Sequence, residues 1–173
     1  MSGHVHGTRR EITKLMDQPQ AGLDLSDPSL RRLAVAAAAG RPNLIRHITI
    51  LLESDPDATV RRESAEVLGA TPGADTKPLL AALADVSPVV REAAAFALGE
   101  IVDLASVSRL IEVAVDPDED TLVREAAVAA LGAVGDPAAV PALLDLITSG
   151  PPQVRRRCVP ALTVFDDGRI EPA

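Results

Sequence analysis

Apolar residues recur along this chain at the spacing of one face of an α-helix. In four segments that align without gaps, mostly apolar or small residues stand one position before an arginine and three, seven and ten positions after it. At 3.6 residues per turn, these offsets fall on one side of a helix. The pattern predicts one amphipathic helix for each copy. The copies begin at Val60, Val90, Val123 and Val154, and a weaker fifth copy begins at Leu30.

The residues ahead of each arginine indicate where these helices begin. Four positions before it stands an Asp or Ser in four of the five copies, and proline follows Asp27 and Ser87. A side-chain oxygen at this place accepts a hydrogen bond from the free amides of a helix start, and proline suits the first helical position. Glycine near the far end is typical of helix C-termini. The expected caps are Asp27, Asp57, Ser87 and Asp120, and the glycines are Gly69, Gly99 and Gly132.

A second set of apolar segments lies between the first helices, at 44–52, 78–84, 107–115 and 140–147. Their spacing is helical rather than alternating, and they are not rich enough in β-branched residues to favour strands. The repeating unit is therefore expected to be two helices joined by a turn, about 30 residues long. We predict an all-α fold, an α-solenoid of about five stacked two-helix repeats. The expected repeats are 8–41, 42–72, 73–102, 103–135 and 136–165, after a disordered segment 1–7 and before an incomplete further repeat at 166–173.

The three central copies resemble HEAT-like repeats, in the short bacterial form named after phycobilisome lyases. That pattern is close to Asp-x-x-x-x-Val-Arg-x-x-Ala-x-x-Ala-Leu-Gly, and the outer copies depart from it where Leu25 and Ser149 replace the acid. The resemblance implies that the arginine-bearing helices line a concave face. It also implies a ladder of Asp and Arg side chains that ties neighbouring repeats together. The matching ladder residues are Asp55, Arg61, Asp85, Arg91, Asp118 and Arg124.

The charge of the chain is uneven. Its 17 basic and 25 acidic residues give a net charge of −8, but residues 63–150 hold 4 basic and 15 acidic residues, a net charge of −11. Such a block repels a phosphate backbone and attracts basic partners. Aromatic residues make up only 1% of the chain, which removes the stacking platforms that bind single-stranded nucleic acid. Nucleic acid is therefore not the expected partner.

Few residues offer chemistry. His4 and His6 lack the further ligands that a zinc site needs, and no phosphate-binding or hydrolase motif is present, so we expect no metal, cofactor or catalytic residue. Cys158 stands in an apolar column and is expected to be a buried structural thiol. Neither an apolar signal segment nor a stretch long enough to span a membrane is found. These features favour a cytoplasmic protein.

Binding residues are expected on the exposed columns of the concave helices. Phe96 is a large apolar side chain where the helical pattern predicts water, so it is either an interface anchor or a contact with the next helix. We predict a non-enzymatic scaffold or adaptor that binds a peptide or helix of another protein. This partner is expected to carry a basic segment. Its open C-terminal end could also mediate self-association. The expected binding residues are Arg32, Arg62, Glu63, Glu66, Glu92, Phe96, Glu125, Arg156 and Arg157.

Two other functions remain open at this stage. The resemblance to phycobilisome-lyase repeats implies a subunit of a tetrapyrrole (bilin) lyase-type enzyme, although the chain has no Tyr or Trp to line a bilin pocket. A HEAT-like DNA-binding or repair protein is the second alternative, and the acidic block opposes it.

Overall fold

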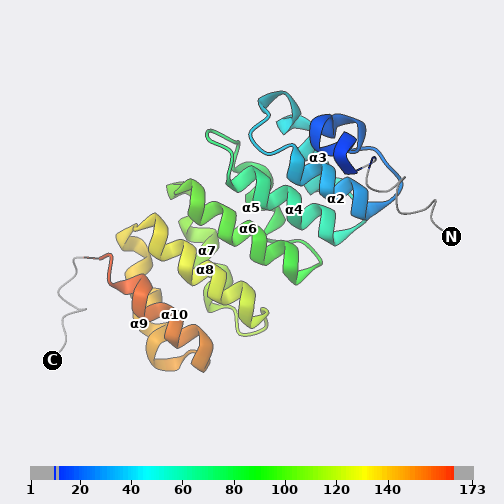
Figure 1. Ribbon diagram of the computed structural model, residues 1–173. Coiled ribbons are helices and arrows are strands. Elements are labelled where there is room, and N and C mark those ends of the chain that lie inside the picture. Colours follow the sequence, from blue (N-terminus) through cyan, green and yellow to red (C-terminus); the bar gives the residue numbers. More distant parts are fainter. Residues whose placement is uncertain (1–9, 11, 166–173) are drawn as a thin grey trace.

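The chain folds as a curved stack of helix pairs (Figure 1). A computed structural model describes residue 10 and residues 12–165. This described part contains helices and no strands, which confirms the all-α prediction. Residues 12–17 are helical and precede α2. The helices that follow are α2 (Pro28–Ala37), α3 (Ile45–Ser54), α4 (Ala58–Gly69), α5 (Lys77–Ala82), α6 (Pro88–Ile101), α7 (Val107–Val115), α8 (Thr121–Val134), α9 (Val140–Ser149) and α10 (Pro152–Leu162).

Short 3-10 helices lie in the connections between helices. They begin at Pro19, Pro42, Leu104 and Pro137, and three of the four open with a proline, whose fixed φ suits a helix start. The expected apolar segment 107–115 coincides with α7, and the other three differ from α3, α5 and α9 by no more than two residues at either end.

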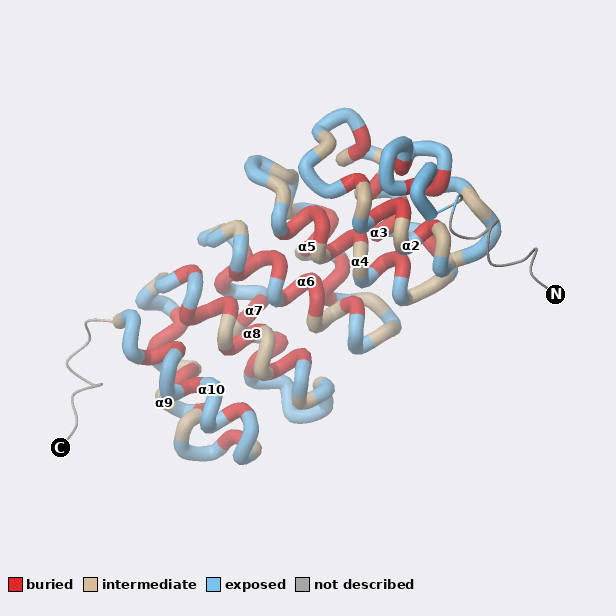
Figure 2. The backbone as a smooth tube through the Cα atoms, in the orientation of Figure 1, coloured by how far each residue is buried: buried red, intermediate tan, exposed pale blue. Residues whose placement is uncertain are grey.

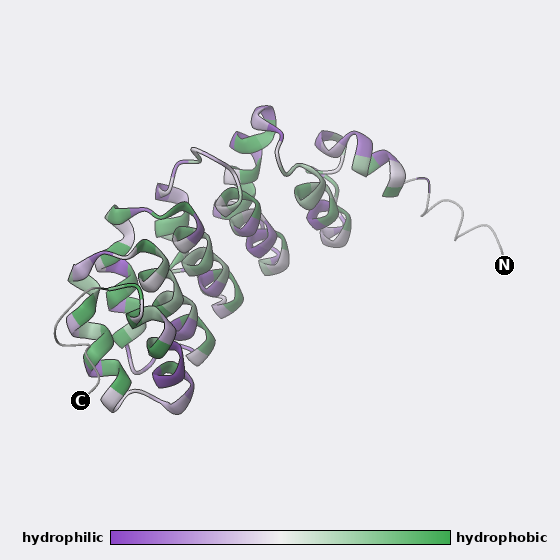
Figure 3. Cartoon of the chain, turned by 60° about the vertical axis from the view of Figure 1, so that its left-hand side comes forward, coloured by the Kyte–Doolittle hydropathy of each residue, from purple (hydrophilic) through white to green (hydrophobic). Residues whose placement is uncertain are grey.

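The helices form two layers. The even-numbered helices α2 to α10 stack directly on one another, whereas the odd-numbered helices touch each other much less. We call these the inner and outer helices. Because the inner helices are packed more closely, the stack bends toward them, and Figure 3 shows the resulting arc. The inner helices therefore carry the concave face.

The core lies between the two layers. Figure 2 shows buried backbone running through the middle of the stack, with exposed residues on both outer surfaces. The expected apolar columns are confirmed in large part: Val60, Val90, Val123 and Val154 are fully buried, as is Leu98. In the column ten positions after the arginine, only Val134 is buried. Each pair of helices is too thin to cover its apolar side alone, so every repeat depends on its neighbours for burial.

Three of the expected helix starts are capped as the sequence indicates. The carboxylates of Asp27, Asp57 and Asp120 each accept a hydrogen bond of 2.8 Å from the backbone N–H two residues later. Ser87 stands at the fourth start, but its hydroxyl makes no capping hydrogen bond. In the last unit, α10 continues through Pro160 and ends two residues later at Leu162.

The glycines near the ends of the inner helices also allow close packing. Gly69 is the last residue of α4, and a Cβ placed on it would lie 2.5 Å from the Cβ of Ala97 on α6. A Cβ on Gly99 would lie 2.8 Å from the Cα of Ala130, although α6 itself continues to Ile101. Gly69, Gly99 and Gly132 all lie at or within two residues of a helix end, as expected. Glycine is needed because the neighbouring inner helix approaches too closely for any side chain.

Candidate functional site

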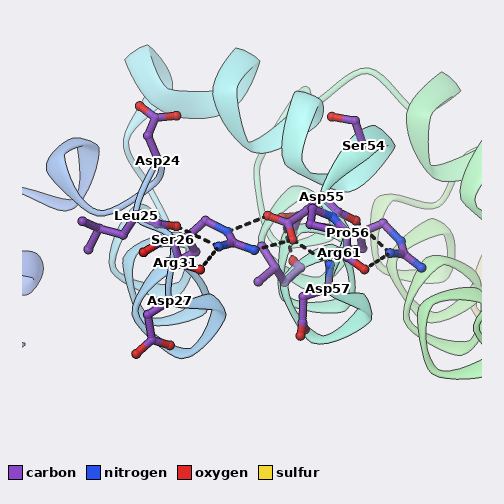
Figure 4. Close-up of polar contacts among 12 residues, drawn as sticks. Asp24, Leu25, Ser26, Asp27, Arg31, Ser54, Asp55, Pro56, Asp57 and Arg61 are labelled. Atoms are coloured by element: carbon purple, nitrogen blue, oxygen red, sulfur yellow. Dashed lines mark hydrogen bonds and ion pairs between the residues drawn. The ribbon is translucent and has the colours of Figure 1, made fainter.

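A ladder of arginines ties the repeats together. The Nε and Nη2 atoms of Arg31 each donate a hydrogen bond of 2.8 Å to the carboxylate of Asp55 (Figure 4). Its Nη1 donates to the carbonyl oxygen of Leu25, six residues earlier. Both side chains are buried. Two parallel hydrogen bonds from a guanidinium to a carboxylate fix distance and orientation together, so this pair sets how α2 meets the turn before α4.

The pairing runs from one repeat to the next. Arg61 binds Asp85 through Nε and Nη2, at 2.7 and 2.8 Å, and again the acid lies 24 residues after the arginine. The acid and the arginine that lie six residues apart in the sequence therefore belong to two different rungs: Asp55 pairs with Arg31, and Arg61 pairs with Asp85. Arg31 belongs to the ladder although its own repeat has Leu25 in place of the acid, because its partner comes from the following repeat.

The third rung corrects the prediction for Asp118. Arg91 binds Glu119, at 2.8 Å from Nε and 2.6 Å from Nη2. The turn that precedes α8 is longer than the turn before α4, and within it the backbone N–H of Asp118 donates to the carboxylate of Asp116. The longer side chain of Glu119 reaches the guanidinium instead.

The rung between Arg61 and Asp85 shifts the pKa of both of its members. Burial alone would raise the pKa of the Asp85 carboxyl, but hydrogen bonds from Arg61 and from the Ser87 N–H, together with the charge of Arg61, hold it below its usual value. The hydrogen bond to Asp85 likewise raises the pKa of Arg61 above that of a free guanidinium. This rung is therefore ionised at neutral pH and serves as a structural tie.

Arg124, the last expected ladder arginine, has no acid. Its Nε donates a 2.9 Å hydrogen bond to the carbonyl oxygen of Ala114, and no carboxylate lies within 4 Å in the described part of the chain. Ser149 and Gly150 stand where the fifth repeat would supply one.

A groove lies on the concave face and crosses four inner helices. Its volume is about 360 Å³, and α6 and α8 form its centre, with α4 and α10 on either side. We call it the concave groove. Phe96 and Leu122 both line it and are 56% and 58% exposed. The lining residues are Arg62, Glu66, Glu92, Ala93, Phe96, Leu122, Glu125, Ala126, Ala129 and Arg157.

The structure brings most of the expected binding residues to this groove. Arg62, Glu66, Glu92, Phe96, Glu125 and Arg157 line it. Arg32, Glu63 and Arg156 do not line it. Because Phe96 stays largely exposed, the next helix does not cover it. Leu122 lines the groove but was not expected, because its exposure there depends on how neighbouring inner helices are spaced.

The charges of the concave groove are only partly paired. Arg62 Nε donates to Glu66 at 2.9 Å, one turn along α4. Glu92, Glu125 and Arg157 have no hydrogen bond or ion pair through their side chains within the described residues. Beside the groove, burial and the neighbouring charge of Glu66 raise the pKa of Glu63. The centre of the groove therefore offers two free carboxylates beside an apolar surface.

The remaining candidate groups show no reactive arrangement. Cys158 is fully buried, and burial raises the pKa of its thiol to about 11, so it is protonated at neutral pH as a structural residue would be. His47 lies 3.1 Å from the carboxylate of Asp24 at the surface. Across the residues that the structure describes, no three His, Cys, Asp or Glu side chains gather as metal ligands. His4 and His6 lie outside the described residues. None of the described helices has the length and apolar character needed to cross a bilayer.

Comparison with known proteins agrees with the repeat architecture. Residues 76–163 match the family of HEAT repeats. The chain belongs to this family. It is also similar to the solved structure of human deoxyhypusine hydroxylase in complex with glycerol, with a TM-score of 0.55 and 19% sequence identity, over 91% of this chain and 74% of that one. At this identity the likeness concerns the fold alone. No curated protein matches the chain.

Proposed function

We propose that this HEAT-repeat chain is a non-enzymatic scaffold that binds a helix or extended peptide of another protein in its concave groove. The observation that carries the proposal is the exposure of Phe96 and Leu122, two large apolar side chains more than half open to solvent inside a hollow. Exposed apolar side chains gathered in a hollow are typical of interfaces, where such residues supply much of the binding energy.

The size and floor of the groove suggest how a partner is held. Ala93, Ala126 and Ala129 also line the groove, and their small side chains leave room beside Phe96 and Leu122. A volume of about 360 Å³ suits one or two apolar side chains of a partner rather than a whole small domain. The partner segment therefore anchors a Leu-, Met- or Phe-sized residue here, and the rest of it lies across the inner helices.

The charges favour a basic residue next to that anchor. Glu92 and Glu125 lie free in the centre of the groove, and the acidic block of the sequence surrounds them. A Lys or Arg of the partner would form an ion pair with Glu92 or Glu125, since Glu66 is already paired with Arg62. Long-range attraction by the acidic block would also speed encounter with a basic segment and make it sensitive to salt.

Other functions gain less from this geometry. The concave groove is lined by neither His nor Cys, and Phe96 is its one aromatic residue. A bilin-attaching or DNA-repairing role would need reactive or basic groups there, and the free charges at its centre are carboxylates. The scaffold therefore has the stronger support.

The test is to capture partners with the purified 173-residue chain from an extract of its source cells and to quantify them by mass spectrometry. Phe96→Asp and Leu122→Asp place a charge in the groove, and each should reduce capture of a true partner at least about tenfold. Leu104→Asp is the matched control, because Leu104 is 63% exposed but does not line the groove.

A captured protein supports the proposal when both groove variants lose it, Leu104→Asp retains it, and raising the salt concentration weakens it. Equal capture by the wild type and both groove variants would contradict the proposal. Amide spectra of the three variants check that each remains folded.

A further inference from the structure

Arg124 is the one ladder arginine among Arg31, Arg61, Arg91 and Arg124 that is buried without a carboxylate. It is only 6% exposed, and its single hydrogen bond runs from Nε to the carbonyl oxygen of Ala114. A guanidinium carries five N–H donors and a permanent charge, so both Nη groups are left without a protein acceptor in the described chain. A nearly buried cation of this kind favours a bound anion.

Arg124 lines a second groove, which lies between the C-terminal end of α7 and helix α9. We call it the outer groove. Its volume is about 770 Å³, and it shares no lining residue with the concave groove. Its walls are mostly apolar. The lining residues are Val115, Pro117, Arg124, Ala142, Asp145, Leu146, Ser149, Gly150 and Pro151.

The fifth repeat cannot supply the missing acid from its own turn. In the complete rungs, the ladder aspartate also accepts a hydrogen bond from the backbone N–H two residues later, as Asp85 does from Ser87. In the fifth repeat, Pro151 lies two residues after Ser149 and has no N–H. The hydroxyl of Ser149 instead donates to the backbone oxygen of Asp145.

We propose that Arg124 and the outer groove bind the side-chain carboxylate of an Asp or Glu that belongs to another protein segment. The ladder itself shows the ligand that this position takes, since three equivalent arginines hold a protein carboxylate at 2.6–2.8 Å. The groove is much larger than a carboxylate group, and its apolar walls have room for the backbone and neighbouring side chains of a segment.

The incoming acid therefore completes the ladder in trans. Asp145 lines the same groove but makes no ion pair with Arg124, and its negative charge opposes the incoming carboxylate. This site is independent of the proposed function, because it selects an acidic segment at the outer groove rather than a basic one on the concave face.

The test observes the Nε–Hε signal of Arg124 by NMR in the full chain, assigned by its loss in Arg124→Lys. The probe is the capped peptide acetyl-Ala-Asp-Ala-amide, and acetyl-Ala-Asn-Ala-amide is its neutral control at equal ionic strength. We expect a saturable shift with the Asp peptide, with a dissociation constant of about 1 mM, since one small contact yields roughly 4 kcal/mol at most. The Nε–Hε signal of Arg91, already bound to Glu119, should not move.

Two variants at exposed positions sharpen the test without removing the arginine. Ser149→Glu supplies a carboxylate from within the chain, so it should shift the Arg124 signal without peptide and abolish the peptide response. Asp145→Asn removes the competing charge and should tighten peptide binding by about threefold.

Each contrary result overturns the inference. An Asn peptide that shifts the signal as much as the Asp peptide shows that the carboxylate is not recognised. Full peptide binding by Ser149→Glu places the binding elsewhere. Acetate that binds as tightly as the Asp peptide shows that the site takes a free small acid rather than a protein segment.

Discussion

The carboxylate of Glu119 receives two hydrogen bonds from the guanidinium of Arg91, although 28 residues separate the two in sequence. Glu119 stands in the turn before α8, which is longer than the turn before α4. The ladder thus continues through this turn because a longer acidic side chain one residue further along takes the place of an aspartate. The ladder preserves the contact between successive repeats rather than the residue that makes it.

The first prediction separates Glu119 from Asp118. Glu119→Gln removes the charge from a mostly buried, doubly hydrogen-bonded pair and should lower the free energy of unfolding by about 2 kcal/mol. Asp118 is engaged through its backbone N–H, so Asp118→Asn should change this free energy by less than about 0.5 kcal/mol. Urea unfolding at pH 7 measures both. Equal effects of the two substitutions would contradict the assigned rung.

The second prediction concerns acid. The pKa of Asp85 is lower in the folded chain than in the unfolded one, so the folded state binds this proton less readily. The ion pair with Arg61 therefore stabilises the fold above about pH 4, and this contribution is lost as the pH falls through the folded-state pKa. Asp85→Asn should cost about 2 kcal/mol at pH 7. The difference in the free energy of unfolding between wild type and variant should shrink as the pH falls below 4. Urea unfolding at several pH values measures this difference, and a difference that stayed constant with pH would contradict the prediction.

The third prediction tests the packing role of glycine. In an exposed helix, Gly→Ala stabilises by about 1 kcal/mol. At Gly99 the added methyl group would meet the backbone of Ala130, so Gly99→Ala should instead destabilise the chain by about 1–3 kcal/mol. Thr163 occupies the same place in the last copy and is exposed, so Thr163→Ala is the matched control and should be nearly neutral. Thermal unfolding of both variants decides whether close approach explains the glycine.

Much of the fold could be predicted from the sequence because each repeat contains the local signals that determine its helices. The apolar columns at Val60, Val90 and Val123 give the buried face, and the capping Asp57 and Asp120 give the helix starts. Each of these signals depends on residues only a few positions apart, so it can be recognised within one helix. The exposed position of Phe96 follows from the same pattern.

The pairings between repeats could not be read in this way. An acid six residues before an arginine is visible, but the bond forms with the acid 24 residues after it, because stacking decides which groups meet. Leu122 was missed for a related reason. Its exposure in the concave groove depends on how the inner helices are spaced, and no single helix reveals that spacing.

The last prediction concerns backbone strain at Val102, which follows α6. Val102 has φ 58° and ψ 49°, a left-handed conformation that costs a residue with a Cβ roughly 1–2 kcal/mol, and branching at its Cβ adds to the crowding. Its side chain is 52% exposed, so little burial is lost when it is removed. Glycine adopts this conformation without that cost, although it also gives the unfolded chain more freedom. Val102→Gly should therefore raise the free energy of unfolding by about 0.5–1 kcal/mol and the melting temperature by about 1–4 °C. The control is Val86→Gly, at a highly exposed valine that does not have a positive φ, and it should not stabilise the chain. Calorimetry of both variants measures the difference, and destabilisation by Val102→Gly would show that the left-handed turn carries no strain that glycine relieves.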